Sequence, residues 1–149
     1  MAFLSSMDIS ASALTAERLR MDVISENMAN ASTTRTENGG PYRRKVVVME
    51  QASQPQSEFR RMVSDRLAAG GQLNKGVKVT KIAEDPSELT PVYDPTNPDA
   101  NAQGYVMMPN VDPVKETIDM MAATRAYEAN LTAFNAVKGM ATKALEMGR

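Results

Sequence analysis

The feature that most constrains this chain is its C-terminal run, which contains neither Gly nor Pro from Val114 to Lys138. The run opens with Asp112 and Pro113. Asp is a good N-cap residue, and Pro fits the first helical position, where a backbone N–H is not needed. The sequence therefore predicts one long helix from Asp112 to Met147.

Two stripes of residues run along this helix at alternating spacings of four and three, the period of a coiled-coil seam. The first stripe is Met120, Thr124, Tyr127, Leu131, Phe134, Lys138, Ala141 and Leu145. The second is rich in alanine and allows another backbone to approach closely: Ala122, Ala126, Ala129, Ala133, Ala136 and Met140. Two adjacent stripes indicate that the helix has more than one neighbour.

The length of this helix points in the same direction. A helix of this extent spans roughly 54 Å, whereas a compact domain of this chain length has a radius of gyration of only about 15 Å. We therefore expect other chains to bury part of the apolar surface. The alternative is a helical hairpin closed on itself.

The N-terminal segment predicts a second long helix, from about Leu4 to Ala29. Residues 1–38 contain no Gly and no Pro, and a seam at the same spacing runs through Leu4, Met7, Ala11, Leu14, Arg18, Met21, Ser25 and Met28. Arg18 within this seam is either a register device or the partner of a carboxylate such as Glu128 or Asp119.

The middle of the chain differs in composition, because all eight prolines lie between Pro41 and Pro113. Strands are predicted at residues 43–49, 77–82 and 104–108. Residues 59–67 are of uncertain type, residues 70–71 form a turn, and residues 85–98 follow an irregular path with four X-Pro pairs. The predicted fold is mainly α with a small β-rich insertion. It divides into an N-terminal axial helix (1–34), the insertion (35–110) and a C-terminal axial helix (111–149).

Charge is divided within the insertion. Residues 35–81 hold ten basic and four acidic residues, whereas residues 82–101 hold five acidic residues and no basic one. Ordinary solvated loops would explain this. The alternative is that neighbouring copies dock positive face to negative face.

Composition excludes several functional classes. The chain has no Cys and no His, which removes thiol and imidazole chemistry and most zinc and haem ligation. The acidic group Asp112, Glu116 and Asp119 lies in the first turns of the long helix, where it complements the helix dipole. We predict no catalytic residue, no metal and no cofactor. A net charge of −1 predicts no nucleic-acid binding, and no apolar run is long enough for membrane insertion. The first residues do not resemble a cleaved signal peptide.

Several blocks resemble the rod, hook and hook-associated family of bacterial flagellar axial proteins. Residues 24–31 (ISENMANA) resemble its N-terminal signature, and residues 125–130 (RAYEAN) resemble its other shared block. Five further blocks resemble the proximal-rod branch of this family: residues 33–36 (TTRT), 39–44 (GGPYRR), 76–79 (GVKV), 93–100 (YDPTNPDA) and 104–111 (GYVMMPNV). The resemblance runs nearly end to end, with the blocks in order.

The resemblance implies a structural subunit of the proximal rod, the shaft that passes motor torque outward through the periplasmic space. It implies as partners copies of the chain, other proximal and distal rod proteins, the ring-to-rod adaptor, the membrane-ring protein and the flagellar type III export apparatus. The residues expected at assembly interfaces are Leu14, Met21, Asn27, Asn30, Ala122, Arg125, Ala126, Tyr127, Ala129, Asn130, Leu131 and Phe134.

Two other functional classes stay open on the residues alone. One is a soluble helical-hairpin interaction module, acting as an adaptor or export chaperone, which would be a well-folded monomer or dimer. The other is a rod-associated peptidoglycan-cleaving enzyme, which would need a pair of carboxylates in a cleft.

Overall fold

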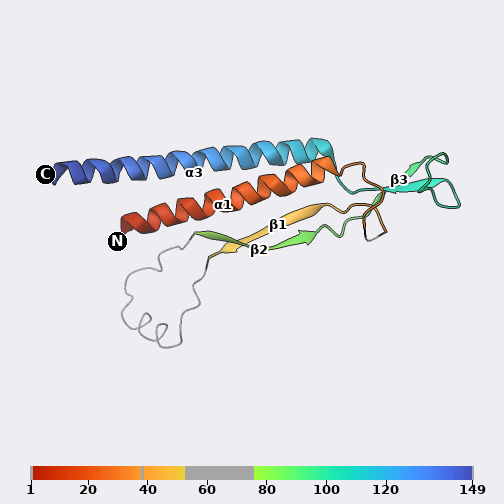
Figure 1. Ribbon diagram of the computed structural model, residues 1–149, viewed down its shortest axis with the longest axis horizontal. Helices are drawn as coiled ribbons and strands as arrows, with labels where there is room; N and C mark the ends of the chain where they lie inside the picture. Colours follow the sequence, from red (N-terminus) through yellow and green to blue (C-terminus); the bar gives the residue numbers. More distant parts are fainter. Residues whose placement is uncertain (1, 38, 53–75, 149) are drawn as a thin grey trace, which may run out of the picture.

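The computed structural model describes residues 2–37, 39–52 and 76–148, and it shows an elongated molecule. Its elements, in chain order, are α1 (Ala2–Ala29), β1 (Lys45–Gln51), β2 (Val77–Glu84), β3 (Thr90–Tyr93), β4 (Tyr105–Met108) and α3 (Pro113–Met147). The two helices lie side by side and antiparallel, so both chain ends are at one end of the molecule (Figure 1). The prediction of a mainly α chain with a small β insertion is confirmed.

Helix α3 begins where the sequence predicts. Asp112 has an extended backbone, and its carboxylate accepts a hydrogen bond of 2.9 Å from the Val114 N–H. Pro113 occupies the first turn, and the helix continues for 35 residues to Met147. The N-terminal helix is also confirmed, although α1 begins at Ala2, two residues before the predicted start.

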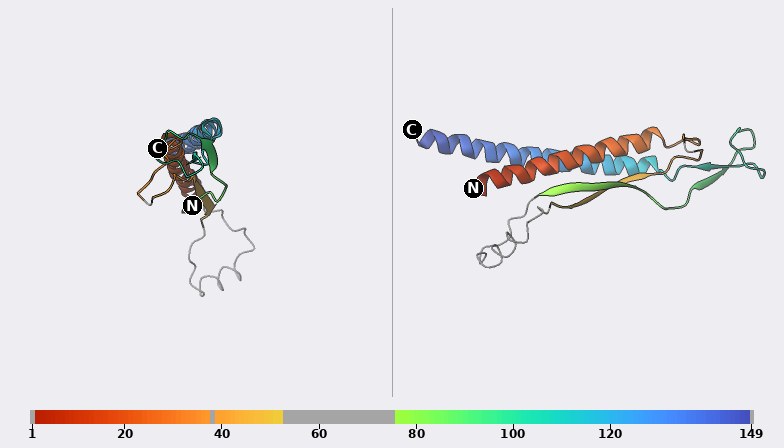
Figure 2. Two further views of the ribbon diagram at one scale, coloured as in Figure 1. Left: turned by 90° about the vertical axis from the view of Figure 1, so that its right-hand side faces the viewer. Right: turned by 60° about the horizontal axis from the view of Figure 1, so that its bottom comes forward.

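Helix α1 is the central layer, because it packs against α3 on one side and against β1 and β2 on another (Figure 2). Its buried side chains are Ser10, Ala16, Val23, Ile24 and Asn27. The predicted seam is therefore only partly correct, since Ala11, Arg18, Ser25 and Met28 are exposed. A seam of period 3.5 assumes one partner, whereas α1 divides its apolar surface between a helix and a sheet.

The corresponding face of α3 is also rotated relative to the predicted stripe. Ala123 is completely buried, and Met120, Tyr127 and Phe134 are half-buried. Their stripe mates are exposed: Thr124, Leu131, Lys138 and Leu145. One half of the predicted stripe thus packs within the chain, while the other half faces outward.

The β elements form two separate antiparallel pairs, β1–β2 and β3–β4. Strands β1, β2 and β4 lie within two residues of their predicted positions. The β1–β2 pair has an irregularity in register between Val48 and Met49. Just before β2, Gly76 has a φ of +81° and lies against α1, so that a Cβ there would clash with Ser12 Oγ.

Strand β3 corrects the prediction of an irregular path from residue 85 to residue 98. Pro91 is a local signal against a strand. Among the described residues, however, β3 pairs only with β4, and proline is tolerated in an edge strand whose N–H would face solvent. The expectations for residues 59–67 and 70–71 lie outside the described residues. In the part of the chain that the structure describes, neither helix is long and apolar enough to cross a membrane.

Candidate functional site

A polar cluster with a buried centre joins the end of α1, the start of β1 and the start of α3. We call it the polar junction; it consists of Asn27, Tyr42, Arg44, Glu116 and Asp119. Its centre is Asn27, which is 1% exposed. The Asn27 amide nitrogen donates to the Lys45 carbonyl (2.9 Å) and to Glu116 Oε2 (3.0 Å). Its amide oxygen accepts from the Tyr42 hydroxyl and from the Lys45 N–H, both at 2.9 Å.

These four hydrogen bonds use the whole capacity of the Asn27 amide. Two of them go to the N–H and C=O of one residue, Lys45, as a neighbouring strand would bond to it. Asn27 therefore covers the start of the β1 edge and attaches β1 to α1.

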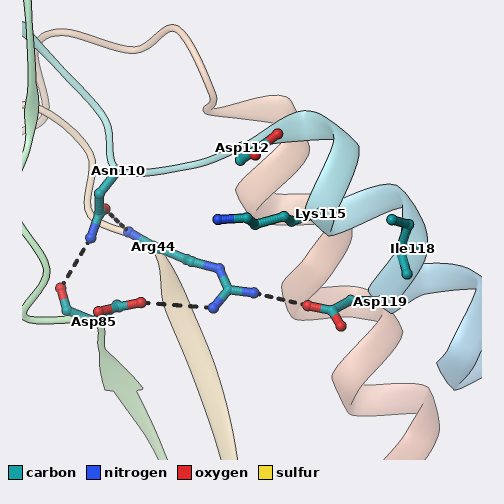
Figure 3. A pocket seen from close by; sticks show the side chains of 7 residues that line it. All are labelled: Arg44, Asp85, Asn110, Asp112, Lys115, Ile118 and Asp119. Carbon is teal, nitrogen blue, oxygen red and sulfur yellow. Dashed lines mark hydrogen bonds and ion pairs between the residues drawn. The ribbon is translucent and has the colours of Figure 1, made fainter.

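Glu116 is the charged member of the junction and is 0% exposed. Its Oε1 accepts from Arg44 Nε at 2.5 Å. Arg44 also reaches Asp119 Oδ2 at 3.0 Å and Asp85 Oδ2 at 3.7 Å (Figure 3). The Arg44 guanidinium thus connects α3 to the end of β2. The backbone N–H of Arg44 donates to Asn110 Oδ1 at 2.8 Å.

The charges of the junction reinforce this arrangement. Burial, together with the negative charges of Glu26, Glu116 and Glu84, raises the pKa of Tyr42 to about 12. Burial alone would lower the pKa of Arg44, but its bond to Glu116 and the charges of Asp119 and Asp85 raise it overall. Hydrogen bonds from Ser87, followed by the charge of Arg44, lower the pKa of Asp85. These shifts keep Tyr42 protonated and Arg44 and Asp85 charged at neutral pH.

A cavity of about 380 Å³ opens beside the junction. Its lining combines both signs of charge, as Figure 3 shows: Arg44, Asp85, Asn110, Asp112, Lys115, Ile118 and Asp119. Arg44 and Asp119 already pair with each other there, and Asp112 caps α3. Within the described residues, no three or more Asp or Glu side chains are grouped so as to hold a metal ion.

The second candidate site is an exposed strip of α3 that lies roughly 90–170° around the helix axis from Glu116 and Ala123, and we call it the outer face. By the ~100° turn per residue of an α-helix, this face comprises Ile118, Ala122, Arg125, Ala129, Ala133, Ala136 and Met140. Every one of these side chains is exposed. The outer face is broad, apolar and made mostly of small residues, so a second helix can approach it closely.

The residues predicted at assembly interfaces fall into three groups. Ala122, Arg125, Ala129 and Leu131 are exposed on α3. The half-buried group comprises Leu14, Met21, Asn30, Ala126, Tyr127, Asn130 and Phe134. Asn27 alone forms the third group, because all the hydrogen-bonding groups of its side chain are used within the polar junction.

The ion pairs in the structure change three interpretations that were based on the sequence. Asp119 pairs with Arg44 and Arg20, and Arg18 is exposed. Glu116 and Asp119 do lie near the start of α3, but they bind Arg44 in addition to complementing the helix dipole. The charge division of the insertion is partly satisfied within the chain, since Arg44 meets Asp85, and Arg35 meets Asp99 at 3.9 Å.

Sequence reasoning did not single out Tyr42 or Arg44 as members of a site. Both lie in the GGPYRR block, where a predicted turn leads into a predicted strand. The signal that could have found them is a basic residue close to an aromatic residue at such a position. Their partners are far away along the chain, so the pairing could not be read from spacing.

Comparison with known proteins agrees with this architecture. A family described as flagella basal body rod protein matches residues 7–35. A second, described as flagellar basal body rod FlgEFG protein C-terminal, matches residues 102–147. These two regions cover most of α1 and all of α3, and they place the chain in the class of flagellar basal-body rod proteins.

Individual relatives identify the family within this class. The chain is 53% identical to flagellar basal-body rod protein FlgC of Bacillus subtilis, over 97% of each chain. It is 43% identical to FlgC of Borreliella burgdorferi over 97% of each chain, and 40% identical to FlgC of Salmonella typhimurium over 100% of each. The chain therefore belongs to the FlgC family and is a structural subunit of the flagellar rod.

Proposed function

We propose that this chain builds the proximal part of the rod, as one layer of a tube that passes motor torque from the membrane ring to the distal rod and hook. Residues 1–34 and 111–149 serve as axial helices in the wall of the tube, and residues 35–110 form the insertion that sets lateral contacts. The role is structural and not catalytic, and it uses no cofactor.

The observation that carries the proposal is the exposed outer face of α3. Ile118 is 57% exposed and Met140 is 60% exposed, with alanines between them. Burying a large apolar side chain stabilises an interface by about 1.5–3 kcal/mol. A helix with a second apolar face that the described residues of its own chain leave uncovered is suited to packing against other subunits.

Long helices in close contact also suit a drive shaft. Close-packed interiors resist compression and transmit strain. The ~52 Å length of α3 spreads a load over many small contacts, and the polar junction fixes α3 to α1 and to the sheet. Torque applied to one helix is therefore carried to the whole subunit.

The partners that we propose are copies of the chain, other proximal and distal rod proteins, the ring-to-rod adaptor and the membrane-ring protein. Their place would be the basal body, where the rod crosses the periplasmic space. The chain would be exported through the flagellar type III export apparatus. The support for these partners is the family, whose named members are basal-body rod proteins.

The experiment is deletion of the gene, followed by complementation. We expect loss of rods beyond the ring in electron micrographs of isolated basal bodies, and recovery with the wild-type gene. An Ala129→Trp variant places a bulky ring on the outer face and should block rod assembly and motility. An Asn135→Trp variant, which is exposed on the polar side of α3, is the matched control and should keep motility.

Normal motility in the Ala129→Trp variant would contradict the outer face as a subunit contact. Intact rods in the deletion strain would contradict the proposed function itself. A chain that melts cooperatively as a fully helical monomer, and that is dispensable for rods, would favour the helical-hairpin adaptor instead.

A further inference from the structure

The β1–β2 pair has two strands, so each strand also has an edge that faces away from its partner. Asn27 shows which backbone groups of β1 lie on that free edge, because it bonds both the N–H and the C=O of Lys45. In an antiparallel pair these groups alternate in direction from one residue to the next. Val47 and Met49 therefore also direct their N–H and C=O away from β2. Among the described residues, none bonds these outward groups.

The residues that flank β1 confirm this alternation. The Arg44 carbonyl accepts from the Asp85 N–H at 2.8 Å, and the Ala52 N–H donates to the Gly76 carbonyl at 2.9 Å. The even-numbered residues of β1 thus bond towards β2. The irregularity in register adds a residue to β2 and none to β1, so the alternation along β1 is kept.

A groove of about 340 Å³ runs along the free edge of β1. Its floor is α1, at Val23 and Ile24, and its far wall is the start of α3, at Glu116 and Asp119. Helix α1 lies between α3 and the β1–β2 pair, which leaves this space open between them (Figure 2). Because α3 closes the far side, the groove admits one further strand and not a hairpin with a helix behind it.

The charges that line the groove are already paired within the chain. Lys45 pairs with Glu26, and Arg20 lies 4.0 Å from Asp119. Arg44 is held by the two acids of the polar junction. A charged side chain that entered the groove would be desolvated without an unpaired charge to meet. The segment that fits is therefore uncharged where it faces α1.

We propose that an extended segment of a different basal-body protein binds in this groove as a third strand on β1. Its backbone pairs with the N–H and C=O groups of Val47 and Met49, and its uncharged side chains lie over Val23 and Ile24. Main-chain hydrogen bonds supply the affinity when a peptide extends a sheet in this way. Asn27 ends the site, because it already occupies the first free position of the edge. The inference rests on the proposed function, and it adds the kind of partner segment.

A second copy of the chain is a poor occupant of the groove. Each described strand belongs to a hairpin. The β1–β2 hairpin also packs on its own α1, and Val77 is bonded to that helix through Ser12. Such a hairpin would bring its partner strand or its helix against α3, where the groove is closed.

Light-activated cross-linking identifies the occupant. A benzophenone amino acid replaces Met49 in chains that are assembled into basal bodies, and the products are mapped by mass spectrometry. We expect a cross-link to an uncharged segment of one different protein. A cross-link to a second copy, or no cross-link, overturns the proposal.

One position in the β1–β2 register supplies both a test variant and its control. Val47 and Ile82 lie opposite each other, and each directs its N–H to the free edge of its own strand. Proline removes that N–H and leaves the bonds between β1 and β2 in place. Val47→Pro should lower the yield of the cross-link by roughly tenfold, and Ile82→Pro should leave it unchanged. Equal yields in the two variants would show that the edge of β1 does not hold the partner.

Hydrogen exchange tests the same contact in the unaltered chain. In the free chain the amides of Val47 and Met49 should exchange faster than those of Val46 and Val48, which bond towards β2. In isolated basal bodies the two outward amides should slow by roughly tenfold or more, because each gains a hydrogen-bond partner, and the Ile82 amide should stay fast. Unchanged exchange at Val47 overturns the proposal, whatever the proline variants do to the fold.

These outcomes are separate from failure of the proposed function. If the chain is present in isolated rods but the Val47 amide stays fast, the groove contact is wrong and the rod function stands. If the chain is absent from isolated rods, the proposed function is wrong.

Discussion

At the scale of single residues, the informative feature is a buried acid whose partners come from distant parts of the chain. Glu116 is completely buried, and it is bonded by Asn27, which precedes it by 89 residues, and by Arg44, which precedes it by 72. A buried charge is tolerated only when it is paired and hydrogen-bonded. Glu116 therefore decides whether the start of α3 can dock on α1.

We expect Glu116→Gln to destabilise the chain by about 1.5–3 kcal/mol, the usual worth of hydrogen bonds to a charged group. Arg44 would keep Asp119 and Asp85, so the loss should stay within that range. Urea unfolding followed by circular dichroism would measure it. Glu128→Gln on the exposed side of α3 is the control and should change the midpoint little. Equal effects of the two substitutions would contradict a special role for the buried carboxylate.

The raised pKa of Tyr42 predicts that the folded chain loses stability at alkaline pH. The pKa of Tyr42 is raised to about 12 in the folded chain, from 10.0. Below pH 10 the phenol is protonated in both states, so the fold keeps its full stability. Above pH 10 the unfolded chain ionises first, and stability falls until the folded phenol also ionises. A shift of this size corresponds to a loss on the order of 2 kcal/mol.

The measurement is the free energy of unfolding between pH 9 and pH 12, compared with Tyr42→Phe. The variant should be less stable at neutral pH by about 1 kcal/mol, because the bond to Asn27 is lost. It should also decline less above pH 10. Parallel curves for the two proteins would show that Tyr42 is not the titrating group.

At the scale of secondary-structure elements, α3 depends on its N-cap. Replacing Asp112 by Ala removes the acceptor for the Val114 N–H, and we expect a cost of about 1 kcal/mol. Asp112→Asn keeps a capping acceptor while removing the charge, so it should lie within a few tenths of a kcal/mol of wild type. Thermal unfolding of the two variants distinguishes the cap from the helix dipole. If Asn is as harmful as Ala, charge and not capping is what matters.

The elements also show how far sequence reasoning reaches. Both helices could be predicted because their signals are local: an Asp-Pro start, long stretches without Gly or Pro, and periodic apolar residues. Strand β3 was missed because Pro91 is a local signal against a strand, whereas an open edge is a tertiary property. The polar junction was not predictable either, since Asn27, Arg44 and Glu116 are brought together only by the fold. Nothing in their spacing marks them as neighbours.

At the scale of the whole molecule, order is expected to be graded along the long axis. The structure indicates where each terminal helix is best held. At one end the polar junction fixes α1, β1 and α3 together. At the other end the last turns of α3 pack against nothing within the described residues, and Met140, Leu145 and Met147 are exposed.

Hydrogen exchange of the unassembled chain should therefore show a gradient of protection. We expect amides near Asn27 and Glu116 to exchange slowest, and those from Met140 to Met147 to exchange nearly as fast as in an unfolded peptide, because an unsupported helix end frays. In isolated rods the slow region should extend to Met147, since subunit contacts supply the missing partner. The Glu116→Gln variant is the control, because it should erase the gradient by weakening the junction while leaving the last turns as they were. Strong protection of the last turns in the free chain would mean that α3 is held by its own sequence, and the argument that assembly completes this subunit would then fail.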